Sequence, residues 1–245
     1  MMSLLKEKNC YLQQKYRVLV LESEALRVQS VSNKLNYLGY QIFTANSQEQ
    51  ALDLIKIHGL PHLAIVDLDS PEVQAYEFCI AIKQFSDLPV ISLIQREHGQ
   101  SAESHHFEHI YDDIVTKPFK PLELIARVQR VLQKFGHYAY PLTAHIVIDE
   151  NLSIDFGHQR AIKCGQSIPL SALETKVLHI LMREAGDIVI SSCLLKRLHL
   201  SKREEKRLGY TVKKLKEKLE IDPENPEYII EEQWIGYRFN GTEIA

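Results

Sequence analysis

The chain has 245 residues, 45% of them hydrophobic, a composition that predicts one or two domains with packed cores and argues against a disordered protein. The formal net charge of −3 gives no sign of nucleic-acid binding over the whole chain, but residues 196–218 hold ten Lys and Arg against three acidic residues. Four cysteines without C-x-x-C spacing predict a cytoplasmic protein with reduced thiols, no disulfide and no zinc site. No apolar run approaches about eighteen residues, so no membrane partner is expected.

Residues 16–135 alternate between short apolar runs and segments of helical length. Five of the runs predict strands, each followed by a helical or helix-length segment. Alternation of this kind predicts an α/β doubly wound fold, a parallel sheet with helices on both faces. Residues 1–15 precede the pattern as an N-terminal extension. The expected strands cover 17–21, 41–44, 63–66, 90–94 and 113–115.

Charged residues stand where several of these strands end. Asp67 closes one buried strand, Lys117 follows another, and Glu22 follows the first. Ligands of open parallel sheets bind at the carboxyl ends of the strands, where these residues and Ile94 are expected to lie. A carboxylate beside a lysine suits phosphoryl acceptance, because the cation neutralises charge on the acyl phosphate. A purely structural ion pair between Asp67 and Lys117 is the alternative, and the residues leave both open.

A linker at 136–141 is expected to separate this domain from residues 142–245. In the second domain, four short alternating runs predict a small antiparallel sheet, and Ser171 and Glu174 form a capping box that opens a helix. A second short helix, a third over about 202–219 and a closing hairpin follow. The third helix sets apolar residues on one face. Its opposite face carries Arg203, Lys206, Arg207, Tyr210, Lys213 and Lys214.

This α+β order of elements resembles the winged helix-turn-helix DNA-binding domain of the OmpR/PhoB response regulators. The resemblance implies double-stranded DNA as the partner, with the third helix in the major groove and its cations on phosphates. The alternative is that the basic side chains of this helix only keep a surface helix solvated and contact no DNA. Four motifs carry the resemblance: Ile168-Pro-Leu-Ser-Ala-Leu-Glu174, Val212-x-x-Leu215-Lys-x-Lys-Leu219, Asp222-Pro-x-Asn-Pro-x-Tyr-Ile229 and Ile235-Gly-Tyr-Arg-Phe239. The implied DNA-binding residues are Arg203, Lys206, Arg207, Tyr210, Thr211, Lys213, Lys214 and Arg238.

Two features of the second domain depart from that family. The hairpin carries Gln233 and Trp234 where most members carry Arg-Gly, so no arginine is expected to enter the minor groove from there. Trp234 is expected instead to cover the hairpin. The loop over 199–207, which can touch RNA polymerase in the family, is short here, and this leaves RNA polymerase open as a partner.

The first domain resembles the CheY-like receiver domain of the same regulators. The resemblance implies Asp67 as phospho-acceptor, Lys117 as the lysine beside it and Glu22 as the first of an acidic pair. Ser23 replaces the second acid, and Ile94 replaces the hydroxyl residue that contacts the phosphoryl group. Because Mg²⁺ prefers charged oxygen ligands and one acid is replaced, we expect Glu22 and Asp67 to hold it only weakly. No cofactor is expected to be required. A sensor kinase stays open as a partner.

A homodimer through the receiver is also implied by the resemblance. His105, Asp112, Asp113, Glu123 and Arg127 match positions that pair across the dimer face, and His105 would make the pairing with Glu123 depend on pH. The neighbouring histidines 98, 105, 106 and 109 include a pair one helical turn apart, a spacing that can bind a metal. An exposed polar helix is the favoured interpretation.

Together these patterns predict a two-domain, sequence-specific transcriptional regulator that is not an enzyme and is switched weakly or not at all by phosphate. Ile114, at a position where the family has an aromatic switch residue, adds to the case against a phosphate switch. Two alternatives stay open. One is an orthodox phosphate-switched regulator using Asp67, and the other is an interaction module with weak DNA binding.

Overall fold

The computed structural model describes residues 16–22, 25–69, 74–95, 110–135 and 143–240. The expected extension at 1–15 and the expected linker at 136–141 lie outside these ranges. The first group of elements forms a five-stranded sheet of order β2-β1-β3-β4-β5 in which every pairing is parallel. This confirms the predicted doubly wound sheet. The strands are β1 (Arg17–Leu21), β2 (Gln41–Ala45), β3 (Leu63–Asp67), β4 (Val90–Gln95) and β5 (Asp113–Lys117).

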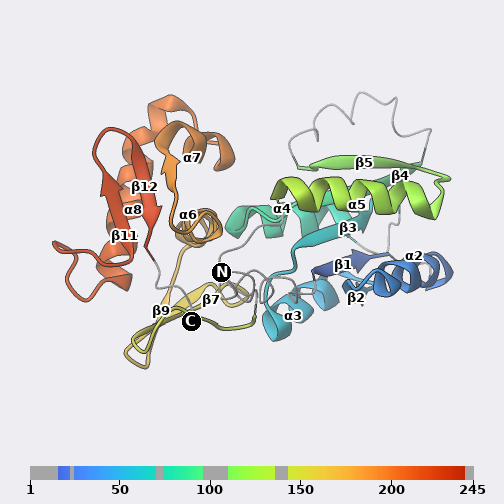
Figure 1. The fold of residues 1–245 in the computed structure, drawn as a ribbon, viewed down its shortest axis with the longest axis horizontal. Helices are drawn as coiled ribbons and strands as arrows, with labels where there is room; N and C mark the ends of the chain where they lie inside the picture. The colour runs from blue at the N-terminus through green and yellow to red at the C-terminus, as the bar shows by residue number, and fades with distance from the viewer. Residues whose placement is uncertain (1–15, 23–24, 70–73, 96–109, 136–142, 241–245) are drawn as a thin grey trace, which may run out of the picture.

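Helices cover both faces of this sheet (Figure 1). α2 (Ala25–Tyr37) and α5 (Pro121–Phe135) pack on one face, and α3 (Gln48–His58) and α4 (Ala75–Phe85) pack on the other. α3 begins with a side-chain cap, since Ser47 Oγ accepts the Gln50 N–H at 3.2 Å. The Gln50 side chain accepts from the Asn46 N–H and not from the Ser47 N–H, so the two residues do not form a full capping box. The helix expected between β4 and β5 lies outside the described residues.

The second group of elements contains two antiparallel sheets and three α-helices. β6 (Ile146–Val147), β7 (Leu152–Asp155), β8 (Arg160–Lys163) and β9 (Gln166–Pro169) form the predicted small sheet in chain order. α6 (Ala172–Arg183) follows, and both hydrogen bonds of its predicted capping box between Ser171 and Glu174 are present. α7 (Ser191–Arg197), a 3-10 turn η4 (Lys202–Glu204) and α8 (Glu205–Leu219) come next.

The closing hairpin is part of a larger sheet than the sequence predicted. β11 (Ile229–Glu232) pairs with β12 (Gly236–Phe239), and β10 (Ile188–Ile190) joins them on the far side of β12. No strand was predicted before α7. The missed signal is only three residues long, Ile188-Val189-Ile190, in which Val189 alone is buried. We call the β11–β12 hairpin, residues 229–239, the wing.

Candidate functional site

α8 has the two-faced character that its sequence predicts. Leu208, Val212, Leu215 and Leu219 are buried on its inner side. The side chains predicted to meet DNA lie mostly on the opposite side, where a phosphate backbone could reach them. Of the residues predicted to meet DNA on η4 and α8, Arg203, Lys206, Arg207, Tyr210 and Lys213 are exposed, and Lys214 is partly exposed beside them.

Two of these cations are held by acidic residues three positions away in the chain. Arg207 pairs with Glu204 at 3.1 Å, and Lys214 pairs with Glu217 at 2.8 Å. Lys214 also lies over the ring of Tyr210, 5.7 Å from its centroid. Exposed pairs of this spacing contribute only about 0.3–0.5 kcal/mol, so phosphate groups can replace the carboxylates at little cost.

Thr211 is a correction to the predicted DNA-binding set. Its side chain is 6% exposed, and its hydroxyl donates to the Arg207 carbonyl oxygen at 2.8 Å. Thr211 follows Tyr210 directly, and one step along a helix turns a side chain by about 100°, enough to move it from the outer face to the inner one. Thr211 therefore supports the helix and does not face outward.

The wing differs from its predicted form at Trp234. We expected the indole to cover the hairpin, but Trp234 is 101% exposed and projects from the turn between β11 and β12. Its backbone is left-handed, with φ of 67°, and the turn is closed by the Ile235 N–H on the Glu232 carbonyl oxygen at 3.0 Å. Arg238 lies farther along β12, opposite Ile230 of β11, and pairs with Glu232 at 2.9 Å.

Two buried carboxylates position α8 and the wing, and sequence reasoning missed both roles. Glu220, at the end of α8, accepts backbone N–H groups of Glu227, Tyr228 and Ile229 at 2.7–3.1 Å. Glu174 accepts from Lys218 Nζ at 2.6 Å and so links α6 to α8. A fully buried acid at a helix end marks such a role in a structure, but in sequence Glu220 is indistinguishable from the acidic segment that follows it.

The predicted phosphoryl site assembles at the carboxyl edge of the parallel sheet. Asp67 is 2% exposed at the end of β3 and forms an ion pair with Lys117 at the end of β5. Lys117 also reaches Asp69 Oδ2 at 3.3 Å, and the Asp69 N–H donates to Asp67 Oδ1 at 3.0 Å. Asp69 thus takes part through both its backbone and its side chain. Glu22 is buried directly after β1, whose Leu21 is level with Val66, so it stands at the same edge.

The remaining positions of this site bear on its chemistry. Ile94 lies partly buried on β4 opposite Thr116 of β5, and an aliphatic side chain there donates no hydrogen bond. Ile114 is exposed on β5. Ser23 lies outside the described residues. Carboxylate oxygens of Glu22 and Asp67 are the hard ligands that Mg²⁺ prefers, so the donor type fits that ion.

Three of the predicted dimer-face residues, Asp112, Asp113 and Arg127, form pairs within one chain. Arg127 Nη1 donates to Asp113 Oδ1 at 2.9 Å, and Arg130, which the sequence analysis did not single out, donates to Asp113 Oδ2 at 2.6 Å. Asp112 accepts from Lys83 at 3.0 Å and from the Val90 N–H at 2.8 Å. Glu123 is exposed in the first turn of α5. His105 and the other three histidines of the metal hypothesis lie outside the described residues.

A second polar cluster lies on the small sheet. Asp155 is buried and accepts from His158 Nδ1 at 2.9 Å and from Arg160 Nε at 3.0 Å.

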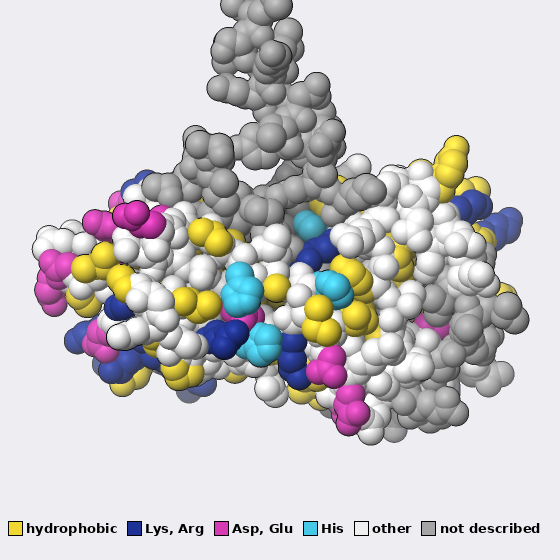
Figure 2. All heavy atoms as spheres, turned by 90° about the horizontal axis from the view of Figure 1, so that it is seen from below, with side chains coloured by type: hydrophobic (Ala, Val, Ile, Leu, Met, Phe, Trp, Pro, Cys, Tyr) yellow, Lys and Arg dark blue, Asp and Glu magenta, His cyan; other side chains and the backbone are white. Residues whose placement is uncertain are grey.

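Within the described ranges, no group of His, Cys, Asp and Glu has the arrangement of a metal site, and no helix is long and apolar enough to cross a membrane. On the face shown in Figure 2, acidic, basic, histidine and hydrophobic side chains are interspersed. That face therefore has no broad surface of a single charge.

Comparisons with known proteins agree with both halves of the fold. The family model described as response regulator receiver domain matches residues 18–129, and that described as transcriptional regulatory protein, C terminal, matches residues 165–239. The probable transcriptional regulator ycf27 of Guillardia theta is 30% identical over 239 residues, covering 93% of this chain and 92% of that protein. The transcriptional regulatory protein KdpE of Mycobacterium tuberculosis is 29% identical over 224 residues, covering 91% and 98%. The response regulator DrrB, a Thermotoga maritima OmpR/PhoB homolog, matches with 26% identity and a TM-score of 0.41, covering 93% of this chain and all of that one.

Proposed function

This chain belongs to the response regulators that join a receiver domain to a C-terminal transcriptional regulatory domain, and we propose that it binds DNA through α8 with little dependence on phosphorylation of Asp67. The match to a C-terminal transcriptional regulatory domain supports DNA as the partner, and we propose that this is double-stranded DNA. The observation that carries the assignment to α8 is its exposed cationic face, set opposite a fully buried apolar stripe. A helix of this kind can enter a major groove while its cations neutralise phosphates.

The wing is proposed to add contacts of a different kind. It presents the exposed indole of Trp234 at its tip, and Arg238 farther along is already paired with Glu232. Electrostatic attraction to DNA should therefore come mainly from α8. The test is the salt dependence of binding, because each phosphate contact contributes about 0.9 to the slope of log affinity against log salt.

Weak phosphate switching is supported by the edge of the receiver sheet. The Lys117 ammonium pairs with Asp67 and also faces Asp69, so it is shared between two carboxylates. Ile94 offers no hydroxyl to the product, and Glu22 and Asp67 would hold Mg²⁺ with one carboxylate fewer than the family's acidic site supplies. When bound, Mg²⁺ would neutralise charge on the incoming phosphoryl group. We propose that it binds weakly and that the protein acts by binding rather than as an enzyme.

Orthodox phosphate switching is the second candidate, and one observation favours it. Asp67, Lys117 and Glu22 do lie at one edge of the sheet, as an accepting site requires. Incubation with acetyl phosphate and Mg²⁺ followed by intact-mass measurement separates the two. We expect less than about one tenth of the protein to gain a phosphoryl group under conditions that label an orthodox receiver fully.

We also propose a homodimer through β5 and α5. Exposed Ile114 and Leu122 lie on these elements beside the charged groups of Asp113 and Arg127, a mixture of apolar and polar surface typical of protein interfaces.

A further inference from the structure

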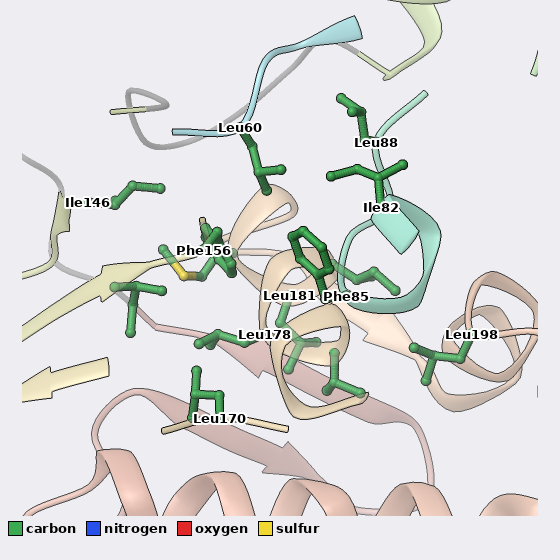
Figure 3. Close-up of a cluster of buried hydrophobic side chains, with 14 of the residues drawn as sticks. Leu60, Ile82, Phe85, Leu88, Ile146, Phe156, Leu170, Leu178, Leu181 and Leu198 are labelled. Atoms are coloured by element: carbon green, nitrogen blue, oxygen red, sulfur yellow. The ribbon is translucent and has the colours of Figure 1, made fainter. Parts of the chain in front are cut away.

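The two domains share one hydrophobic core. α4 of the receiver packs directly against α6 of the DNA-binding domain. Figure 3 shows the shared cluster, with Leu60, Ile82, Phe85 and Leu88 from the receiver facing side chains of the second domain. All four are nearly inaccessible to solvent. The contributors from the second domain include Ile146, Phe156, Leu170, Leu178, Leu181 and Leu198.

Glycines bring the two backbones into direct contact at a second place. A Cβ on Gly157, in the turn between β7 and β8, would lie 2.8 Å from both the Ile55 carbonyl oxygen and the Lys56 Cα of α3. A Cβ on Gly59, at the end of α3, would overlap the carbonyl oxygen of Thr143. Since real Cβ atoms almost never approach other atoms so closely, both positions accept only glycine while the domains stay in this arrangement.

A charged contact joins the same surfaces. Asp87, between α4 and β4, accepts from Arg197 Nη2 at 2.7 Å and from Arg183 Nη1 at 3.3 Å. Its backbone N–H donates to His179 Nδ1 at 3.2 Å, and its carbonyl oxygen accepts from Arg183 at 3.2 Å. Burial raises the pKa of Asp87, but the cations of Arg197, Arg183 and Lys83 outweigh it and leave the pKa below its ordinary value. The carboxylate is therefore charged and its position depends on both arginines.

The contact reaches α8 and leaves the proposed binding surfaces accessible. Arg197 is the last residue of α7, and α7 packs against α8. The outer side chains of α8 remain exposed in the full chain, as do Ile114 of β5 and Leu122 of α5. The arrangement therefore covers neither the proposed DNA face nor the proposed dimer face.

We propose that this interface holds the two domains as one rigid body, in which Asp87 fixes the direction of α8 relative to the β5–α5 face of the receiver. The inference rests on the proposed DNA binding and dimerisation and adds a consequence to them. In a dimer of rigid subunits, the distance between the two α8 helices is set by the protein. The protein should then discriminate between DNA sites by the spacing of their half-sites.

Domain orientation can be measured without DNA. Residual dipolar couplings of the full chain should fit one alignment tensor for residues of both domains, because a rigid body aligns as a unit. Asp87→Ala removes the carboxylate shared by the two arginines, and Gly157→Ala forces the backbones apart without touching a charge. Each should give two different tensors. The control Asp53→Ala breaks the exposed Asp53–Lys56 pair on α3 and should keep one tensor.

The spacing of half-sites provides the functional test. A bound site is first selected from random duplex DNA, and its half-sites are then moved apart in steps of one base pair around one helical turn. The unmodified protein should lose about tenfold or more in affinity for DNA when the half-sites are two base pairs away from their optimal spacing. The affinity of Asp87→Ala and of Gly157→Ala should vary by less than about threefold over the same spacings. Affinity for one isolated half-site should stay within about twofold for all variants.

The outcomes separate this inference from the proposed function. Failure of every protein to bind DNA would overturn the proposed function, and the tensors alone would then decide the rigid body. Two independent tensors in the unmodified protein would overturn the inference. The inference would also be overturned if both Asp87→Ala and Gly157→Ala kept a single tensor and the spacing profile of the unmodified protein. Two unrelated changes to the interface would then leave the orientation of the domains intact.

Discussion

Arg127 and Asp113 are joined within a single chain, with the guanidinium Nη1 at 2.9 Å from the carboxylate Oδ1. Arg130 holds the other oxygen of the same carboxylate at 2.6 Å. Both arginines are partly or largely exposed, so water and partner groups can reach them. A two-fold dimer could therefore release Arg127 to a partner group, because Arg130 would still pair with the Asp113 carboxylate, whose side chain is only 7% exposed.

Charge reversal at Arg127 tests this dimer face. Arg127→Glu places a like charge beside Asp113 and should weaken self-association at least about tenfold, as measured by sedimentation velocity over a concentration series. The matched control is Lys56→Glu, which reverses an exposed charge on α3. Equal weakening by the control would indicate a general charge effect, and an unchanged Arg127→Glu dimer would have to be held elsewhere.

The cationic face of α8 gives a prediction about salt. Replacing Arg207, Lys213 and Lys214 with Ala should lower affinity for genomic DNA fragments and reduce the log-log salt slope by up to about 2.7, or about 0.9 for each lost phosphate contact. Titration of labelled DNA at four salt concentrations gives the slope. Lys56→Ala serves as the control with the same loss of charge per site. A slope unaltered in a folded triple variant would mean that these cations only solvate the helix.

The receiver edge predicts weak phosphorylation. Asp67→Ala should change DNA affinity by less than about twofold, because the protein is expected to bind DNA without the phosphoryl group. Combining Ser23→Asp with Ile94→Thr restores an acid and a hydroxyl and should increase labelling by acetyl phosphate, which intact-mass measurement detects. Rapid stoichiometric labelling of the unmodified protein, followed by tighter DNA binding, would contradict the prediction.

Two buried histidines predict a loss of stability in mild acid. Burial, helped by Arg17 beside His62 and by Arg183 beside His179, lowers the pKa of each ring from 6.5 to about 3. The folded protein therefore stays unprotonated at pH 5 while the unfolded chain takes up protons. The stability these rings contribute is complete above pH 6.5 and is lost as pH falls toward 3, amounting to about 2 kcal/mol per ring at pH 5.

Urea unfolding at pH 7.5 and pH 5 measures this effect. His62 and His179 each accept a backbone N–H through Nδ1, at 3.0 and 3.2 Å, so Asn can replace the acceptor without titrating. The double Asn variant should lose about 4 kcal/mol less than the unmodified protein between the two pH values. Identical losses would show that other groups cause the acid sensitivity.

The Glu220 carboxylate predicts how the wing is held. Glu220→Ala leaves the buried N–H groups of Tyr228 and Ile229 without their charged acceptor and should lower the free energy of unfolding by about 2–4 kcal/mol. Hydrogen exchange should rise first at Tyr228 and Ile229. Glu224→Ala, a change at an exposed acid in the same loop, is the control and should move stability by less than about 0.5 kcal/mol.

The sequence was sufficient for the elements whose pattern is local. The strands of the receiver, the capping box at Ser171 and the apolar stripe of α8 all follow from the spacing of neighbouring residues. The pairing of Asp67 with Lys117 was also anticipated, since all strands of a parallel sheet end at the same edge, although β4 lies between these two strands.

What the sequence did not reveal depends on contacts between distant residues. Asp87 and Arg197 are 110 positions apart, and nothing near either residue indicates a partner. β10 was missed because three residues are too few for a period, and Trp234 was misplaced because burial of a turn residue depends on what packs beside it. Thr211 was assigned through the family resemblance, although its position on the helix turns it inward.

The shared core has a consequence for how such a protein can be divided or recombined. Separating the domains would expose Phe85 and Leu88 on the receiver and Leu178 and Leu181 on the DNA-binding domain. Each isolated domain would then carry an exposed hydrophobic patch. The isolated fragments should be prone to aggregation. Grafting this DNA-binding half onto another regulator's receiver would lose the aspartate that Arg183 and Arg197 require. Substitutions on the two sides of this boundary are consequently constrained to arise together during evolution.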